Sequence, residues 1–498
     1  MQENKYITWI AHAHLYKNKK VIENYNEEIQ ILVHPKHPRV CLNLGQENIV
    51  EQVAKLPKSI QLYFYSCVWM NFALKDDTDS DFLIDFILLP ILEYCEINSI
   101  YSTADMVWDD HAISDRACVF LQLSKMPKLS LIKVKIENHL NLIKQNLNII
   151  LNSKKWASNN HRVFHLCAAY CLAKFFTKNK QKEKFYLSEL ELFIKSLIDI
   201  PTGLSVEQSI SYYYFDIQLC QLVLNFIRDT GNNLSFSIED ITSNQDRHLQ
   251  SLAFPDGMLP ASGDTPFDFK RHIDLSPDEQ VFYWKNLERL GHYRGCSPNK
   301  KFHYHLLSHN AESAHGHKSP LHLDLWVEGI GMIFVDSGGP YRYGDKLRYS
   351  WFMAQKAHNT IDFLYPNNAN EKSQIIVKNK QDHLMALYTQ INSFLVRKLQ
   401  SANNFFCIND LINAGTNWEL NFHLSPSVSL EQMDTNTFKI IGEGKQLSMV
   451  FELPSDVNLG LYKSYLTTGT GQKQLTTSLE ISGGEGIFDI TCRIIILE

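Results

Sequence analysis

The stretch LIKVKIENHLNLIKQNLNII at residues 131–150 indicates how the first half of the chain folds. Its apolar residues recur three or four positions apart, as on one face of an α-helix. The same spacing returns at residues 161–178, 186–198 and 212–227. Consecutive amphipathic helices joined by short polar links predict stacked helical hairpins or an (α/α) toroid. The apolar face of the first stretch comprises Ile132, Ile136, Leu140, Ile143, Leu147 and Ile150.

The hydrophobic period falls to two from about residue 300 onward. Apolar and polar residues alternate in NWELNFHLSP (417–426), LSMVFELP (447–454) and GIFDITCRIIILE (486–498), and glycine-rich turns separate such runs. This pattern predicts an antiparallel β-sandwich. The sequence therefore indicates a multidomain α+β protein.

We place three segments along the chain. Residues 1–75 are ambiguous and could form an α/β cap, because they include the strand-like run SIQLYFYSCVWM at 59–70. Residues 76–298 are the predicted toroid and residues 299–498 the predicted sandwich. A linker is expected at GHYRGCSPNKK, residues 291–301.

Composition narrows the class of protein. The chain has 498 residues and a formal charge of −6, whereas a dedicated nucleic-acid binder normally carries a basic surplus. Ten cysteines are scattered without a C-x-x-C pair, which favours reduced thiols. The apolar run at 82–95 is too short and too broken by polar residues to span a membrane. No secretory signal is recognisable, so we expect a cytoplasmic protein, or a periplasmic one if a leader has been removed.

Six of the 20 histidines lie between residues 301 and 322, which is about seven times their average frequency in the chain. His315 and His317 are two positions apart, so on a strand they would lie on one face. Asp336 ends an apolar run in IFVDSGG, and His358 follows in AHNT. Two histidines and one aspartate from three segments suit zinc. The alternative is that these histidines are bonded to the backbone.

The helical half offers further candidates. Asn160 and His161 stand where a helix should begin, so they could be simple caps. Tyr212 and Tyr213 lie in SISYYYFD, where the tyrosines could be packing aromatics. The stretch WDDHAISDR, residues 108–116, could form a local salt-bridge network.

Several stretches occur together in a specific order: WDDHAISDR, NNHRVFHL, EQSISYYY, FPDGMLPASGDT, AHGHKSPLHLDLW, FVDSGGPYRYG and AHNTIDF. Their order and wording resemble the heparinase II/III-like family of polysaccharide lyases. The resemblance runs from about residue 100 to residue 365, and more loosely to the C-terminus. It implies an incomplete (α/α) toroid followed by an antiparallel β-sandwich, and cleavage of uronic-acid polysaccharides by β-elimination.

The resemblance also implies roles for single residues. Asn160, His161, Tyr212 and His315 would be catalytic: the first two would neutralise the substrate carboxylate, and the last two would move protons, from opposite sides of the sugar or with Tyr212 doing both. A structural divalent metal, expected to be zinc, would be bound by the family's ligand set. That set falls here on His317, Asp336 and His358.

An anionic polysaccharide or oligosaccharide is therefore the expected partner. We expect neither nucleic-acid binding nor a membrane span, and the sequence leaves the oligomeric state open. Because the net charge is negative, local basic residues should bind such a chain; the candidates are Arg116, Arg342 and Arg348. The order Tyr212 then Tyr213 leaves the second tyrosine as a competitor for the catalytic role.

Three features depart from the family pattern. Ser319 stands where many relatives have aspartate, so His322 could replace His317 as metal ligand. Relative to the family pattern, one residue is inserted in GIGMIFVD, and the signal sequence expected of a degradative lyase is not recognisable. These departures leave room for a role in capsule or surface-glycan metabolism. They also leave two other functions open, a uronosyl C5-epimerase and a catalytically silent glycan-binding or assembly protein.

Overall fold

The structure is a computed structural model. It describes residues 16, 19–25, 28–35, 38–43, 48–74, 80–102, 105–156, 160–269, 291–310, 313, 315–342, 345–364, 372–374, 383–390, 392–469 and 472–497. The chain divides into two compact units. Unit 1 comprises Met1–Ile198 and Asp216–Asp240, and unit 2 comprises Asp199–Phe215 and Ile241–Glu498.

Unit 1 begins with a three-stranded antiparallel sheet in the order β1-β2-β3. Its strands are β1 (Ile22–Tyr25), β2 (Glu28–Ile31) and β3 (Val40–Asn43). Three short helices follow, α1 (Ile49–Ala54), α2 (Lys58–Ser66) and α3 (Val68–Ala73). The first segment is thus α/β.

The strand-like reading of residues 59–70 is wrong, because this run forms α2 and α3. Its aromatic residues favour strands in isolation, but Gln61, Phe64 and Tyr65 are buried at helical spacing within α2, and tertiary packing overrides the propensity. Cys67, with a left-handed φ of 57°, separates the two helices.

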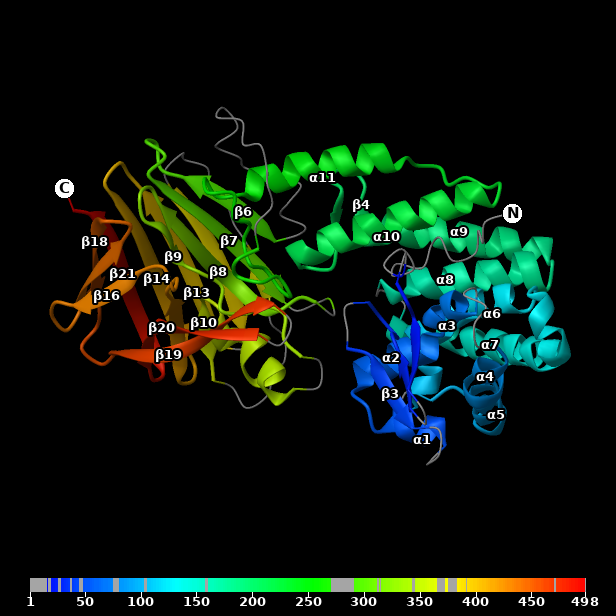
Figure 1. The fold of residues 1–498 in the computed structure, drawn as a ribbon. Coiled ribbons are helices and arrows are strands. Elements are labelled where there is room, and N and C mark those ends of the chain that lie inside the picture. The colour runs from blue at the N-terminus through cyan, green and yellow to red at the C-terminus, as the bar shows by residue number, and fades with distance from the viewer. Residues whose placement is uncertain are drawn as a thin grey trace. The chain divides into compact units, whose positions relative to one another are not determined.

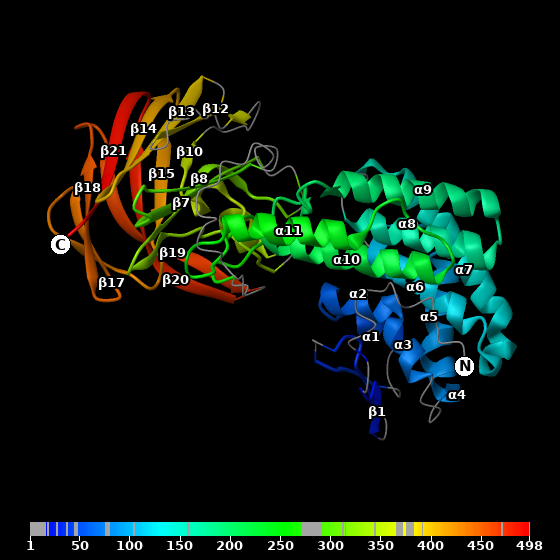
Figure 2. The same ribbon diagram turned by 90° about the horizontal axis from the view of Figure 1, so that it is seen from above.

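The remaining helices of unit 1 pack beside one another along the chain (Figures 1 and 2). They are α4 (Ser80–Leu83), η2 (Ile84–Leu88), α5 (Leu89–Ile97), η3 (Met106–Trp108), α6 (Asp110–Leu123), η4 (Pro127–Ile132), α7 (Lys133–Asn152), η5 (Lys154–Trp156), α8 (His161–Cys171), η6 (Leu172–Phe176) and α9 (Lys180–Leu197). The helical face predicted at 131–150 is confirmed in α7, where Ile136, Leu140, Ile143, Leu147 and Ile150 are all buried.

Two long helices and a strand pair connect this region to the sheets in sequence. They are β4 (Ile198–Asp199), β5 (Leu204–Ser205), α10 (Ile210–Asp229) and α11 (Ile238–Leu252). The division between the units falls within α10 and near the start of α11.

Apart from the β4-β5 pair, the described residues of unit 2 form three antiparallel sheets (Figure 1). The first has the order β6-β7-β8-β9, the second β10-β15-β20-β19, and the third β11-β12-β13-β14-β21-β18-β17-β16. The strands are β6 (His292–Cys296), β7 (Phe302–Asn310), β8 (Lys318–Val327), β9 (Gly331–Phe334), β10 (Ile361–Phe363), β11 (Lys372–Gln374), β12 (His383–Gln390), β13 (Ser393–Ser401), β14 (Phe405–Ala414), β15 (Trp418–His423), β16 (Ser429–Gln432), β17 (Thr437–Gly442), β18 (Lys445–Glu452), β19 (Asn458–Gly469), β20 (Gln472–Gly483) and β21 (Gly486–Ile496).

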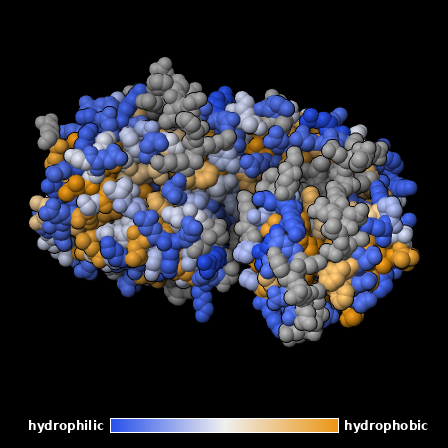
Figure 3. Space-filling model, in the orientation of Figure 1, coloured by the Kyte–Doolittle hydropathy of each residue, from blue (hydrophilic) through white to orange (hydrophobic). Residues whose placement is uncertain are grey.

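The predicted alternation is confirmed in these strands. Trp418, Leu420 and Phe422 of β15 are buried together with Phe488 and Ile490 of β21, and all five belong to one hydrophobic core. The helical region followed by antiparallel sheets confirms the fold class. Many of the residues on the face seen in Figure 3 are hydrophilic, with hydrophobic ones between them.

The prediction of a linker at residues 291–301 is wrong, because β6 occupies the first half of this segment. Tyr293 and Arg294 of β6 pair with Leu306 and His305 of β7, so this segment is part of a sheet. The proposed domain boundaries at residues 75 and 298 stay predictions.

Two further sequence expectations concern cysteines and membrane spans. Each of the ten cysteines is a free thiol, and eight are buried. Among the helices that the structure describes, none has the length and apolarity needed to cross a membrane.

Candidate catalytic and metal sites

The first turn of α10 brings Tyr212 against His315, which is far away in the sequence. The two rings stack with centroids 3.4 Å apart and an angle of 14° between their planes. Tyr212 is partly exposed, whereas His315 is 6% exposed. Two groups that can exchange protons therefore lie in contact, on the same side of any ligand that approaches the tyrosine.

Asp264 fixes the orientation of both histidines of the H-x-H stretch. Its Oδ2 lies 3.1 Å from His315 Nδ1, and its Oδ1 lies 3.1 Å from His317 Nε2. Arg348 donates to both carboxylate oxygens, at 2.9 and 2.8 Å. Burial alone would raise the pKa of Asp264, but the bonds from His315, His317 and Arg348 hold it far below its usual range. The carboxylate is therefore ionised and binds each histidine through one defined nitrogen.

The sequence did not reveal this role of Asp264. The residue lies in FPDGMLPASGDT, a stretch that contributed to the family resemblance, but no spacing connects it to the histidines. His315 and His317 were expected on one face of a strand, and this expectation is wrong. Both precede β8, in a turn and an extended segment, and their shared partner Asp264 brings them together instead.

A cavity of about 290 Å³ adjoins this cluster within unit 2, lined by Tyr212, Asp264, Tyr341 and Arg348 among others. Arg348 thus reaches the cavity as predicted, but its guanidinium is paired with Asp264. Arg342 is exposed. Ser211 and Tyr341 also bring hydroxyl groups to the lining, but Tyr212 is the lining residue whose ring stacks on His315.

Tyr213, the competitor of Tyr212, has a different environment. It is fully buried, and its hydroxyl lies 2.8 Å from His292 Nε2. The geometry therefore gives Tyr212 access to a ligand and gives Tyr213 a buried partner.

That partner is the first of a buried hydrogen-bonded chain. His292 Nδ1 lies 3.0 Å from His305 Nε2, His305 Nδ1 lies 3.2 Å from Asp324 Oδ2, and Asp324 Oδ1 lies 2.9 Å from His322 Nε2. At the far end, the backbone N–H of Asn359 donates to His322 Nδ1 at 2.9 Å. Two of the six histidines between residues 301 and 322, His305 and His322, therefore belong to this network.

The Asn359 N–H determines the proton positions in the chain. His322 Nδ1 must accept, so its Nε2–H donates to Asp324. The other oxygen of Asp324 then accepts from His305 Nδ1–H, whose Nε2 accepts from His292. Because His292 Nε2 is left as an acceptor, the Tyr213 hydroxyl is the donor.

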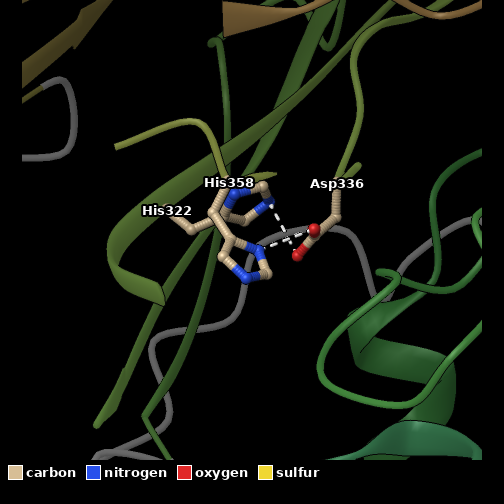
Figure 4. Close-up of side chains that lie close together, drawn as sticks. All are labelled: His322, Asp336 and His358. Carbon is tan, nitrogen blue, oxygen red and sulfur yellow. Dashed lines mark hydrogen bonds and ion pairs between the residues drawn. The ribbon is translucent and has the colours of Figure 1, made fainter. Parts of the chain in front are cut away.

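Three residues adjacent to this chain can supply metal ligands. His322, Asp336 and His358 offer ligand atoms that all lie within 4.8 Å of one another, and each is buried. Figure 4 shows the two imidazoles beside the Asp336 carboxylate, with His358 Nδ1 2.7 Å and His322 Nε2 3.6 Å from its oxygens. Burial would raise the pKa of Asp336, but His358 and His322 hold it far below its usual range.

His317, the ligand predicted from the sequence, borders the same place. A Cβ built on Gly338 would lie 2.5 Å from His358 Cε1, 2.9 Å from Asp336 Oδ1 and 2.9 Å from His317 Nδ1. The three predicted residues therefore surround Gly338, where any larger residue would clash. They sit in loops next to β8, β9 and β10, and not within the strands.

Chemically, two imidazoles and a carboxylate fit a divalent ion, although the ligand atoms that lie within 4.8 Å of one another are those of His322, Asp336 and His358. His317 Nδ1, Asp336 Oδ2 and His358 Nε2 are buried atoms without a hydrogen-bond partner among the described residues. Such atoms are costly unless a ligand satisfies them. His322 is less suitable, because Asn359 and Asp324 engage both of its nitrogens. Burial lowers the pKa of His322, but Asp336 and Asp324 raise it overall. Its Nδ1 nevertheless carries no proton, because it accepts the hydrogen bond from the Asn359 N–H.

Unit 1 holds the other two predicted catalytic residues. Asn160 occupies the N-cap of α8 without a side-chain capping bond, and its Nδ2–H donates to Asp216 Oδ1 at 3.2 Å. His161 Nδ1 lies 2.8 Å from Asp110 Oδ2, which also binds His165 Nε2 at 3.0 Å. The capping interpretation is therefore wrong for the Asn160 side chain, and a carboxylate orients His161 as Asp264 orients His315.

Asp110 belongs to the predicted local network at residues 108–116. Although burial raises the pKa of Asp110, the bonds from His161 and His165 lower it far below its usual range. The convergence of Asn160 and His161 with Tyr212 and His315 at one cavity stays a prediction.

Arg116 needs a correction. It is fully buried, and its guanidinium donates to the carbonyls of Tyr65 and Val107 at 3.1 and 2.7 Å and lies 5.1 Å from the Trp108 ring centre. A side chain in this position stabilises the interior of unit 1 and cannot contact a glycan at the surface.

Comparisons with known proteins agree with these observations. Residues 307–493 match the family model described as Heparinase II/III-like, C-terminal. No curated protein sequence matches the chain. A structure of heparinase III is 14% identical and has a TM-score of 0.66, covering 100% of this chain and 85% of its own.

Two further structures have the same fold. A heparan sulfate lyase from Pedobacter heparinus is 15% identical, with a TM-score of 0.56 and coverage of 94% of this chain and 81% of its own. A second heparinase III structure, with methylated lysines, is 12% identical, with a TM-score of 0.61 and coverage of 100% and 84%. At these identities the structures establish a shared fold.

Proposed function

Because residues 307–493 form a heparinase II/III-like C-terminal domain, we propose that the protein is a polysaccharide lyase that cleaves a uronic-acid-containing glycan by β-elimination. The observation that carries the proposal is the contact between Tyr212 and His315 beside a cavity, with Asp264 behind the histidine. This arrangement supplies an acid and a base held in one place.

β-Elimination breaks the C5–H bond of the uronate, and the electron pair forms the C4–C5 double bond as the C4–O4 bond breaks. The base in this proposal is His315, because the Asp264 carboxylate stabilises the imidazolium that forms when it takes the C5 proton. Tyr212 is the acid, since a neutral phenol can protonate the departing O4. In this proposal both groups act from the same side of the sugar, whereas the sequence interpretation also allowed them to act from opposite sides.

The C5 proton is too weakly acidic while the adjacent carboxylate carries full charge. We assign its neutralisation to Asn160 and His161, whose side chains can donate hydrogen bonds to the carboxylate and to the developing enolate. Asp216 and Asp110 orient these two donors. Arg342, which is exposed, is the remaining arginine candidate for binding the anionic chain.

A divalent metal, zinc by preference, would be held by His317, Asp336 and His358 in this proposal. Its contribution would be structural: when bound, it would neutralise the buried carboxylate and tie together the loops next to β8, β9 and β10. Asp264 would keep His317 Nδ1 directed toward that site, because it binds the opposite nitrogen. A role in capsule or surface-glycan metabolism belongs to the same proposal.

The same-side arrangement favours elimination over C5 epimerisation. An epimerase removes the C5 proton from one face and returns a proton to the other, so it needs groups on both faces. Tyr212 and His315 are in ring contact, so no sugar can lie between them.

The test is a screen of uronate glycans with ultraviolet absorbance as the readout for unsaturated uronate. The wild-type protein should generate this absorbance with one class of glycan, and Tyr212→Phe should not. Deuterium uptake at C5 from heavy water without chain cleavage would instead identify an epimerase. Binding without either reaction would identify a silent glycan-binding protein.

A further inference from the structure

Unit 1 contains a cavity of about 760 Å³ that none of the residues assigned above lines. It lies between the end of α6, the start of α7 and the segment that joins α8 to α9. This volume is within the range of pockets that bind small ligands. Its charged lining residues are Lys125, Lys133, Lys174, Lys178, Lys180 and Glu137.

The local charge is opposite to that of the whole chain. Lys174 and Lys180 both pair with Glu183, at 2.8 and 2.9 Å, and Lys133 lies 3.8 Å from Glu137. The five ammonium groups thus face two carboxylates, in a protein of net charge −6. A concentration of one sign of charge in a hollow attracts ligands of the opposite sign.

Aromatic rings line the same cavity. Phe175 and Phe176 are partly exposed there, and the ammonium groups of Lys125 and Lys174 lie 5.7 and 5.9 Å from the Phe175 ring centre. The ring therefore holds two like charges near each other. Cations beside apolar rings suit an anionic sugar, which has apolar C–H faces and charged substituents.

The backbone of this segment is irregular in two ways. Residues Leu172–Phe176 form a π-helical turn, a feature that often occurs at functional sites. Lys178 has a φ of 50°, a left-handed conformation that favours glycine, yet it carries a long side chain that lines the cavity. The conformation ends the helix, because the Thr177 and Asn179 N–H groups donate to the carbonyls of Leu172 and Ala173, and it places the Lys178 side chain at the cavity.

We propose that this cavity is an accessory binding site for an anionic oligosaccharide with carboxylate or sulfate groups. The choice of ligand rests on the proposed lyase function, because a second binding site on a lyase would increase its affinity for a polymeric substrate. The site is separate from His161, which begins α8, whereas the cavity adjoins the other end. The eleven residues of α8 extend about 16 Å.

The experiment measures calorimetric binding of a size-defined hexasaccharide of uronic acid and sulfated glucosamine. The test variant is Lys125→Glu/Lys178→Glu, and the matched control is Lys55→Glu/Lys58→Glu, which changes the net charge equally at exposed positions of unit 1. The wild type and the control should bind at two sites. The test variant should lose one site, or bind it at least about tenfold more weakly.

A second readout uses substrate length. On a substrate too short to reach the cavity, kcat/KM of the test variant should equal that of the control, and on the polymer its KM should rise. Equal binding and equal KM of the two variants would overturn the accessory site while leaving the lyase intact. Loss of a binding site in a protein that cleaves no uronate glycan would support the site and overturn the lyase. Preferential loss of RNA binding would reject a glycan as the ligand. Lys125→Gln/Lys178→Gln repeats the test if the charge reversal impairs folding.

Discussion

Replacement of Asp264 by asparagine separates the positioning of the catalytic pair from the stability of unit 2. The substitution keeps the shape of the side chain but removes the charge that His315, His317 and Arg348 share. An amide also presents N–H groups to partners that are themselves donors. We expect the orientation of His315 to be lost.

The structure supplies a matched control. Arg397 and Asp410 form a second buried two-bond pair in unit 2, at 2.9 and 2.8 Å, and no candidate catalytic residue touches Asp410 in the described part of the chain. Removing one partner of such a pair leaves a buried charge and costs about 3–5 kcal/mol. For a unit of this size the loss corresponds to a fall in Tm of roughly 6–20 °C. Asp264→Asn and Asp410→Asn should therefore be destabilised to a similar extent.

Activity should distinguish the two variants. Loss of a correctly positioned base lowers kcat by roughly 10²–10⁴-fold, so we expect this reduction for Asp264→Asn and a kcat near the wild-type value for Asp410→Asn. The assay is the initial rate of ultraviolet absorbance at a temperature where calorimetry shows both variants folded. Asp264→Glu, which keeps the charge, should recover part of the activity. Equal kcat values for the two asparagine variants would refute the positioning role.

Three further predictions concern the two tyrosines, a buried aspartate and the candidate metal site. Tyr212→Phe should lower kcat by roughly 10²–10⁴-fold with little change in Tm. Tyr213→Phe removes the hydroxyl that donates to His292, so it should lower Tm more than kcat. The reverse ranking would place the catalytic hydroxyl on Tyr213. Burial and a neighbouring carboxylate raise the pKa of Asp115 to about 8. The folded state therefore binds more protons than the unfolded state between about pH 4 and pH 8. Over this range the free energy of unfolding falls by up to about 1.4 kcal/mol for each unit by which the pH rises. Asp115→Asn should therefore raise Tm by an amount that grows from pH 5 to pH 8, and a constant difference would contradict this assignment. A chelator should lower the Tm of the wild-type protein but not that of His358→Ala, and an equal shift in both would argue against a metal at this site.

The repeating patterns of the sequence predicted the fold because they report burial directly. The face of α7 and the alternation in β15 and β21 appear in the structure at the expected residues. The pattern failed at residues 59–70, where aromatic residues with strand propensity pack as helices, and at residues 291–301, where a polar run conceals β6. In both places tertiary contacts decide the structure.

The residue types of the candidate site could be predicted from the sequence, but their hydrogen-bond partners could not. The family resemblance indicated Tyr212 and His315, yet only the folded chain shows that Asp264 orients the histidine. Arg116 was a reasonable candidate by charge, and its burial against backbone carbonyls depends on how the helices of unit 1 pack. Hydrogen-bond partners so distant in sequence leave no local signal.

The central claim is elimination at a uronate, and the mass of the products tests it most directly. The protein is incubated with the glycan that it cleaves, and the fragments are analysed by mass spectrometry in ordinary and in heavy water. The account predicts fragments whose new non-reducing ends are lighter by one water than hydrolysis products and absorb in the ultraviolet. Saturated ends that have gained water, or an uncleaved chain with deuterium at C5, would contradict it.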